Sequence, residues 1–238
     1  MSNTTKDVRS ISLKLILVSF LFVVAIFIFG FIADEVVIEK KDLFDTRAFH
    51  FFEQFATPAF INTAHSITFF GSTKFFFPAY SVLILYFLFK RKRAYAVDIA
   101  LVGASSTVLM LTLKKIFNRQ RPDHPIFKAL TNNSFPSGHA LSSFIFCSVL
   151  IYIVWNGAWK PAWKWVASVL LFLFAVSIGI SRIVLRYHYA SDVVAGMCLG
   201  FVWALLSLWL LKKIRRRPDV HEPDQQAVSG PLSPGGGT

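Results

Sequence analysis

Histidines and positively charged residues gather in three short segments of this sequence, 114–122, 136–139 and 181–192. Carboxylates do not balance the positive charge, because only Asp123 and Asp192 lie in or beside these segments. A concentrated, under-neutralised group of Lys and Arg indicates a site for an anion with several negative oxygens. Arginine suits such an anion because its planar fork matches the geometry of a phosphate. The candidate site residues are Lys114, Arg121, Ser137, Gly138, His139, Arg182, His188 and Asp192.

The middle segment is a polar turn, Pro136-Ser137-Gly138-His139, directly before an apolar run. Ser137 is a good helix N-cap, and Pro136 sets the direction of the chain that enters the helix. Gly138 lets the backbone approach a ligand closely, and the first turn of the helix offers unpaired N–H groups to an anion. A plain capping turn needs no histidine, so we interpret this turn as a cradle for the anion with His139 as an attached acid.

The last segment combines a histidine with a carboxylate, since Asp192 follows His188 by four residues. The two side chains share one face if a helix begins near His188. A carboxylate on one ring nitrogen fixes the tautomer and leaves the other nitrogen free to attack an electrophile. His188 then has to be neutral while His139 carries a proton, and the near-neutral pKa of histidine suits both duties.

These segments lie among long apolar runs that predict a membrane protein. The chain has 238 residues, 55% of them hydrophobic, and its mean hydropathy is +0.55. Six blocks are apolar enough to cross a bilayer of about 30 Å, although two of them need flanking residues to do so. We therefore predict an all-α, polytopic bundle of six transmembrane helices. The blocks are Leu15–Ala33, Phe75–Phe89, Ile99–Leu113, Ala140–Trp159, Trp165–Ser181 and Val193–Leu211.

Basic residues in the loops set the orientation of this bundle. Lys90–Arg93 and Lys212–Arg217 directly follow apolar blocks, where cytoplasmic loops concentrate Lys and Arg. Lys6, Arg9 and Lys14 precede the first block in the same way. Both termini are thus predicted to be cytoplasmic, and the three candidate segments meet on the opposite side. The net charge of +12 therefore reflects membrane topology, and we expect no nucleic-acid partner.

Two stretches fall outside the six blocks. Residues 34–73 form an external stretch, whose second half, 54–73, is interpreted as an interfacial or re-entrant amphipathic helix. The stretch 218–238 is rich in Pro, Gly and Ser and is predicted to be a disordered cytoplasmic tail, which leaves one integral membrane domain at 1–217. In the last block, the small residues Gly196 and Gly200 indicate close helix packing.

Together the three segments resemble the signature motifs of the type 2 phosphatidic acid phosphatase and vanadium haloperoxidase superfamily. KKIFNRQRP, PSGH and SRIVLRYHYASD match these motifs in their internal spacing and in their order along the helices. The resemblance covers the membrane core, roughly residues 75–211. It implies a membrane-embedded lipid phosphatase that hydrolyses a phosphate monoester or diphosphate through a phosphohistidine intermediate at the extracytoplasmic face.

The resemblance also implies a role for each candidate residue. His188 would attack phosphorus, Asp192 would orient His188, and His139 would protonate the leaving oxygen. Three cations around the phosphoryl oxygens replace the metal ions that other phosphatases use, so we expect no metal site, no cofactor and activity without added divalent metal. The residues implied to hold these oxygens are Lys114, Arg121, Arg182, Ser137 and, through its amide, Gly138.

Three other residues receive lesser roles in this interpretation, and two histidines receive none. Arg186 follows the arginine of the third motif by four residues and is a further candidate to meet the phosphate or a lipid headgroup. Arg119 and His124 are expected to line the entrance or to meet headgroups. His50 and His65 precede the motifs and receive no catalytic role.

The sequence leaves alternatives open. Candidate substrates are phosphatidic acid, phosphatidylglycerol phosphate, an isoprenoid diphosphate and a lipid A phosphate. The same histidine could pass the phosphoryl group to another lipid-linked acceptor, as a phosphotransferase does, or the pocket could bind vanadate for peroxidase chemistry. A non-catalytic anion-binding or transport protein would also explain the cations, but it would need neither the histidine pair nor its carboxylate. We expect a bacterial cytoplasmic membrane with the site on its periplasmic or extracellular side, and no feature indicates the oligomeric state.

Overall fold

The computed structural model describes residues 2–38, 43–128 and 130–215, and within these ranges the regular elements are helices. Five apolar segments are long enough to cross a membrane. The predicted all-α membrane bundle is thereby confirmed, whereas the predicted tail, 218–238, lies outside the described residues. The five helices that form these spans are α1 (Ser2–Ile32), α5 (Arg93–Phe117), α6 (Gly138–Asn156), α7 (Pro161–Val184) and α8 (Ala190–Arg215).

A bent pair of helices forms one further candidate membrane span. α3 (Pro58–Phe69) leads through a short break into α4 (Thr73–Phe89), and the two axes differ by 42°. Together they meet the length and hydropathy of one broken span or of a re-entrant turn. The Thr57 side chain caps α3, and proline occupies its first turn, where a missing N–H costs nothing. Most of the stretch 54–73 is therefore joined directly to the short apolar block that follows it.

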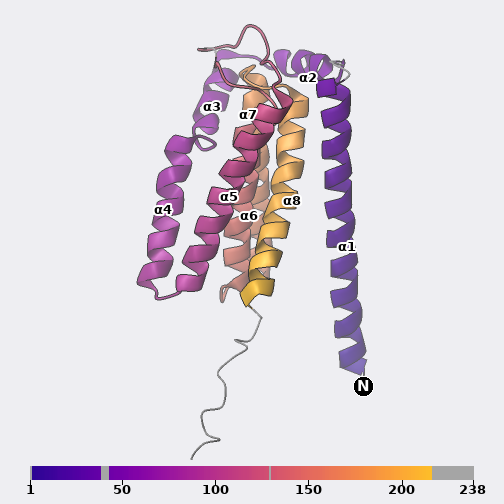
Figure 1. Ribbon diagram of the computed structural model, residues 1–238, viewed down its shortest axis with the longest axis vertical. Coiled ribbons are helices and arrows are strands. Elements are labelled where there is room, and N and C mark those ends of the chain that lie inside the picture. Colours follow the sequence, from indigo (N-terminus) through magenta and orange to yellow (C-terminus); the bar gives the residue numbers. More distant parts are fainter. Residues whose placement is uncertain (1, 39–42, 129, 216–238) are drawn as a thin grey trace, which may run out of the picture.

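The course of the chain brings distant segments to one end of the bundle (Figure 1). α1 and its π-helical end η1 (Ala33–Ile38) reach this end, and α2 (Leu43–Glu53) lies across it. α4 then runs away from it, α5 returns to it, and α6, α7 and α8 repeat this alternation. The loop between α5 and α6 and the link between α7 and α8 consequently lie at the same end as α2, as the topology drawn from the loop charges predicted.

α6 is the central helix, and it packs against α5, α7 and α8. The contact with α8 depends on glycine, because a Cβ added at Gly196 would lie 2.7 Å from the Ser137 carbonyl oxygen. At Gly200 an added Cβ would lie 3.0 Å from the Leu141 carbonyl oxygen. The predicted close packing at these glycines is confirmed, and it holds the first turn of α8 against the turn that precedes α6.

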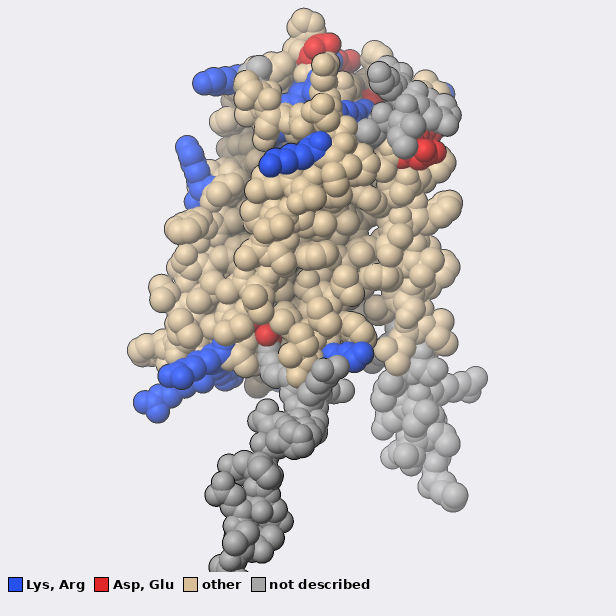
Figure 2. Space-filling view, in the orientation of Figure 1, with Lys and Arg blue, Asp and Glu red and all other residues tan. Residues whose placement is uncertain are grey.

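The charged side chains lie mainly near the two ends of the molecule. Figure 2 shows most Lys and Arg side chains of the visible face near these ends, with an almost uncharged band between them. The exposed cluster 90–93 and the exposed pair Lys212 and Lys213 lie at the end opposite α2. An uncharged band of this kind is the surface that a bilayer core requires.

Candidate active site

The three motif segments meet at the end of the bundle that α2 covers (Figure 1). Direct hydrogen bonds join them. The Ser137 amide donates to the Asp192 carbonyl oxygen at 3.0 Å, and Arg121 Nη1 donates to the Tyr187 carbonyl oxygen at 2.5 Å. Residues that the sequence separates by 55 and 66 positions are therefore neighbours in the fold.

The first segment is turned back over the bundle where α5 ends. Asn118 adopts a left-handed conformation, with φ of 45°, and its amide donates to the Lys114 carbonyl oxygen at 3.2 Å. Arg121 follows this turn and is fixed by Asn132, because its Nε donates to the carbonyl oxygen and its Nη2 to the side-chain oxygen, each at 2.7 Å. The remaining nitrogen, Nη1, lies 3.2 Å from Nε2 of His188.

His188 is buried, with 1% of its surface exposed, and each of its ring nitrogens has a defined partner. Nδ1 lies 3.3 Å from Oδ2 of Asp192 and 3.3 Å from the Ser134 hydroxyl, which also donates to Oδ2. Asp192 is in the first turn of α8, and His188 lies two residues before this helix. The two side chains still face each other, as the four-residue spacing predicted. With Nδ1–H directed at the carboxylate, Nε2 keeps its lone pair and faces Arg121.

Two further cations of the motifs are buried near His188. Lys114 is 8% exposed and Arg182 is 3% exposed. Arg182 donates to the Thr68 hydroxyl at 2.7 Å and lies 4.3 Å above the centre of the Tyr187 ring. Its Nε is buried and has no hydrogen-bond partner among the described residues. A buried donor without a partner is costly, and an oxygen of a bound anion would satisfy it.

The turn before α6 has the geometry that its residue types predicted. The Ser137 hydroxyl accepts a hydrogen bond of 3.4 Å from a first-turn amide and caps the helix. A Cβ at Gly138 would lie 2.6 Å from the Met110 sulfur, so the backbone comes close to α5 there. His139 packs in turn against Gly71 in the break between α3 and α4, where an added Cβ would lie 2.8 Å from its Cδ2.

The electrostatics of the site favour a neutral His188. Burial and the positive charges of Arg121, Arg182 and Lys114 hold the pKa of His188 well below its usual value. Burial also lowers the pKa of the Arg121 guanidinium. His139 lies within electrostatic reach of the same cations and of His188. A bound phosphate would offset this positive charge, whereas the cations by themselves keep the imidazole as the free base that a nucleophile must be.

Three residues of the site were not predicted. Ser134 lies between His188 and Asp192, and its position just before the polar turn was the one signal that could have pointed to it. Arg119, which we expected at the entrance, instead donates to Asp192 Oδ1 at 2.6 Å, with 12% of its side chain exposed. Asp45 accepts from Arg119 at 2.8 Å, although it lies 74 residues earlier in the chain. No local sequence pattern joins such distant residues.

The other charged and histidine residues lie apart from this cluster. Arg186 donates to Glu53 of α2 and lies 5.5 Å above the centre of the Phe49 ring, so its contacts are with α2. His65 packs against Phe127, with 4.5 Å between ring centres. Within the described residues, no three His, Cys, Asp or Glu side chains gather as a metal site would need.

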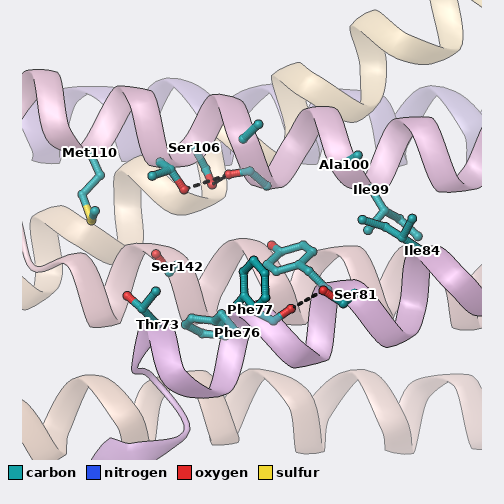
Figure 3. A pocket seen from close by; sticks show the side chains of 14 residues that line it. Thr73, Phe76, Phe77, Ser81, Ile84, Ile99, Ala100, Ser106, Met110 and Ser142 are labelled. Carbon is teal, nitrogen blue, oxygen red and sulfur yellow. Dashed lines mark hydrogen bonds between the residues drawn. The ribbon is translucent and has the colours of Figure 1, made fainter.

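A largely apolar groove of about 390 Å³ lies between α4 and α5 (Figure 3). Thr73, Met110 and Ser142 line one end of it, and Ile84 and Ile99 line the other. The first end adjoins the site, because the Met110 sulfur is the atom that approaches the turn before α6. The groove therefore runs from the cluster of cations along the apolar part of the bundle.

The comparisons with known proteins all indicate the same protein family. The model of the PAP2 superfamily matches residues 95–216. Phosphatidylglycerophosphatase B of Bacillus subtilis is 29% identical over 151 residues, which are 63% of this chain and 74% of that protein. An undecaprenyl-diphosphatase of Sulfolobus acidocaldarius is 28% identical over 147 residues, 57% of this chain and 66% of that protein. The fold is similar to the crystal structure of a transmembrane PAP2-type phosphatidylglycerolphosphate phosphatase from Bacillus subtilis, with a TM-score of 0.73, 23% identity, and coverage of 83% of this chain and 98% of that one.

Proposed function

Because the chain belongs to the PAP2 superfamily, we propose that it is a membrane lipid phosphatase whose reaction passes through a phosphohistidine at His188. The phosphatase class agrees with the relatives, which are named for the hydrolysis of a phosphate monoester and of a diphosphate. One observation carries the proposed mechanism. The Nδ1 side of His188 faces Asp192, while Nε2 faces Arg121 in a pocket of cations.

The reaction has two steps in this proposal. In the first, the Nε2 lone pair of His188 attacks phosphorus, the bond from phosphorus to the leaving oxygen breaks, and His139 gives that oxygen a proton. In the second, His139 takes a proton from a water molecule that attacks the phosphohistidine, and the phosphorus–nitrogen bond breaks. Inorganic phosphate leaves, and both histidines return to their starting states.

The cations supply the charge stabilisation of both steps. Negative charge on the three equatorial oxygens of the transferring group has to be met by donors already in place. Lys114, Arg121 and Arg182 are buried or half-buried and are held by carbonyl or hydroxyl oxygens before any substrate arrives. The capped start of α6 adds the amide of Gly138. This arrangement supports activity without an added divalent metal.

The groove between α4 and α5 supports a lipid as substrate. Its apolar lining suits an acyl or prenyl chain, and one of its ends adjoins the site (Figure 3). A substrate that stays partly in the bilayer would place its phosphate among the cations and its chain along the helices. Phosphatidylglycerol phosphate and an isoprenoid diphosphate are the candidates that correspond to the names of the two relatives described above.

The charge at the two ends of the bundle supports the orientation. The basic cluster 90–93 and the end of α8 mark the cytoplasmic end by the usual bias of membrane proteins. The site at the other end then lies on the extracytoplasmic side, and both termini are cytoplasmic. With a relative of similar length in a bacterium, the bacterial cytoplasmic membrane is the proposed location.

Phosphate release by the detergent-solubilised protein in excess chelator tests this function. The substrates are phosphatidic acid, phosphatidylglycerol phosphate and undecaprenyl diphosphate. We expect release by the wild-type protein and a loss of at least about 1,000-fold in His188→Ala, because the nucleophile is gone. The matched control is His50→Ala, which changes a histidine that is 73% exposed on α2 and should release phosphate at the wild-type rate. Equal release by His188→Ala would overturn the mechanism, and no release by the folded wild type would favour transfer to another acceptor.

A further inference from the structure

The site has one buried carboxylate that the mechanism does not use, Asp45 of α2. We propose that Asp45 is a positioning residue, which holds Arg119 and Ser191 so that Asp192 keeps the orientation that His188 needs. This inference rests on the proposed phosphohistidine reaction. It assigns to α2, which precedes the residues that the family model matches, an indirect, positioning part in that reaction.

Asp45 is buried as deeply as the residues of the motifs. Only 1% of it is exposed, and both carboxylate oxygens accept hydrogen bonds from groups on other elements. Oδ1 accepts from the Ser191 amide at 2.8 Å, and Oδ2 accepts from the Ser191 hydroxyl at 2.6 Å and from Arg119 Nη2 at 2.8 Å. A buried charge is tolerated when it is paired and fully hydrogen-bonded, and Asp45 satisfies both conditions.

Arg119 connects this carboxylate to the one beside the nucleophile. Its Nη2 donates to Asp45, while its Nη1 donates to Asp192 Oδ1 at 2.6 Å and to the Ser191 hydroxyl at 2.9 Å. The guanidinium also lies 3.9 Å above the centre of the Tyr189 ring. Because the guanidinium is planar and rigid, fixing one of its nitrogens also fixes the direction of the other.

The two oxygens of Asp192 have separate tasks. Oδ1 is held by Arg119, and Oδ2 faces His188 Nδ1 and accepts from Ser134 and from the Tyr189 amide. Arg119 fixes the rotation of the carboxylate, so Oδ2 stays directed at the imidazole. Because Arg119 also pairs with Asp45, its positive charge is divided between two carboxylates. Asp192 is therefore neutralised less completely, and its remaining negative charge acts on His188. Loss of Asp45 should therefore reach His188 through two intervening residues.

Asp45→Asn tests the proposal, because it keeps the shape of the side chain and removes its charge. Phosphate release is measured with phosphatidylglycerol phosphate or whichever lipid phosphate the wild type hydrolyses. We expect kcat to fall about 10- to 100-fold, as for other residues that orient a reacting group, with KM within about twofold. Glu53→Gln is the matched control, since Glu53 is another α2 carboxylate that pairs with an arginine, but at an exposed position, and it should keep the wild-type kcat.

Arg119→Gln, alone and combined with Asp45→Asn, distinguishes a positioning role of Asp45 from general damage to the fold. If Asp45 acts through Arg119, its substitution should lower kcat by less than about twofold in the Arg119→Gln background, because coupled residues are not additive. The full loss in that background would contradict the proposed path. A kcat of Asp45→Asn within twofold of the wild type, or a loss confined to KM, would overturn the proposal.

Ser191→Ala covers the case in which Asp45→Asn does not fold. It removes one hydroxyl between Asp45 and Arg119 but leaves both charges paired, so kcat should fall about 3- to 10-fold, the effect of one hydrogen bond. An unchanged kcat in this folded variant would overturn the proposal.

A binding measurement distinguishes failure of this inference from failure of the proposed function. Orthovanadate takes the five-coordinate geometry of the transition state and requires an oriented His188, whereas orthophosphate requires only the cations. Asp45→Asn and Ser191→Ala should weaken orthovanadate binding severalfold and leave orthophosphate binding within about twofold. If this binding pattern is found in a protein that does not turn over substrate, the proposed function is wrong and the positioning role stands. If the variants weaken the binding of both ligands equally, the positioning role is wrong.

Discussion

At the scale of single residues, the site depends on a histidine kept neutral by its surroundings. Burial and the positive charges of Arg121, Arg182 and Lys114 act against an imidazolium at His188, and a hydrogen bond with Ser134 acts for it. The first group prevails, so the pKa of His188 lies well below its ordinary value. The same cations that are proposed to hold the phosphate thus keep His188, the proposed nucleophile, unprotonated before the substrate binds.

The pH dependence of kcat/KM reports this effect. A group with a lowered pKa stays neutral until the pH falls below that value, so the acidic limb due to His188 should lie below about 6.5, the ordinary value for histidine. The measurement is a profile of kcat/KM, which reports the free enzyme, corrected for the ionisation of the substrate phosphate. An acidic limb at or above the ordinary value would mean that His188 is not controlled by these cations.

Arg121→Lys tests the proposed role of Arg121 in binding the phosphate with a fixed geometry. Lysine keeps the charge but cannot replace the three nitrogens that bond to Asn132 and face His188. We expect kcat to fall by about 100-fold or more, as when one preorganised donor is removed. Arg186→Lys is the control, because Arg186 pairs with Glu53 away from the cluster and should tolerate the change. Equal kinetics of Arg121→Lys and wild type would exclude Arg121 as a phosphate clamp.

Sequence spacing was sufficient to predict contacts between residues that lie within one helical turn of each other or within one motif. The four-residue interval predicted that His188 and Asp192 face each other, and the structure agrees. Asp45 and Arg119 were different, because a contact across 74 residues has no periodicity to reveal it. Each looked like an ordinary charged residue of an external loop until the fold brought both beside Asp192.

At the scale of elements, the break between α3 and α4 packs against His139, the proposed acid. Gly71 lies in this break and packs against His139 and Ile178. A Cβ added at Gly71 would lie 2.8 Å from the His139 ring and 2.6 Å from the Ile178 side chain. Distances under about 3.0 Å are not tolerated without movement. A larger residue at this position would therefore move the His139 ring or the helix that carries it.

Gly71→Ala should lower kcat for a lipid phosphate by about 10-fold or more, since small misplacements of a reacting group have large effects. The loss should be smaller for p-nitrophenyl phosphate, whose leaving group needs little help from an acid. Gly30→Ala serves as the control, because no atom lies within 4 Å of an added Cβ there. An equal loss with both substrates would show that Gly71 acts on the fold and not on His139.

The helices themselves were largely predictable, and the break was not. The long apolar blocks and the Ser137 cap correspond to α5, α6, α7 and α8, because hydropathy and capping are local properties. The relation of α3 to α4 depends on how 58–69 and 73–89 pack against the rest of the bundle. Such packing is decided by contacts between distant segments, which the amphipathic pattern of 54–73 does not reveal.

At the scale of the whole molecule, the groove between α4 and α5 connects the charged end to the apolar band. The band and the charged ends were predictable from loop charges, since the bias of Lys and Arg toward one side is a property of each loop alone. The groove was not predictable, because it arises from how the side chains of two separate helices lie against each other. Its place suggests how a substrate remains in the membrane while its phosphate is hydrolysed.

Ala104→Leu tests this use of the groove, since Ala104 lines it and is exposed. The larger side chain should raise KM for a long-chain lipid phosphate by roughly fourfold for each methylene that it displaces from apolar contact. KM for a short-chain analogue, which does not extend along the groove, should be unchanged. Ala162→Leu, at an exposed position of α7, is the control. An equal KM for the long-chain substrate in Ala104→Leu and wild type would place the lipid chain elsewhere.

The most direct test of the mechanism is to trap the covalent intermediate. The wild-type protein is mixed with an isoprenoid diphosphate that carries a ³²P label in its terminal phosphate, and the reaction is stopped in alkali within a single turnover. The labelled peptide is then identified. We expect one acid-labile label on the peptide that contains His188 and no label in His188→Ala. Turnover without a trapped label, or a label that persists in His188→Ala, would contradict the phosphohistidine mechanism.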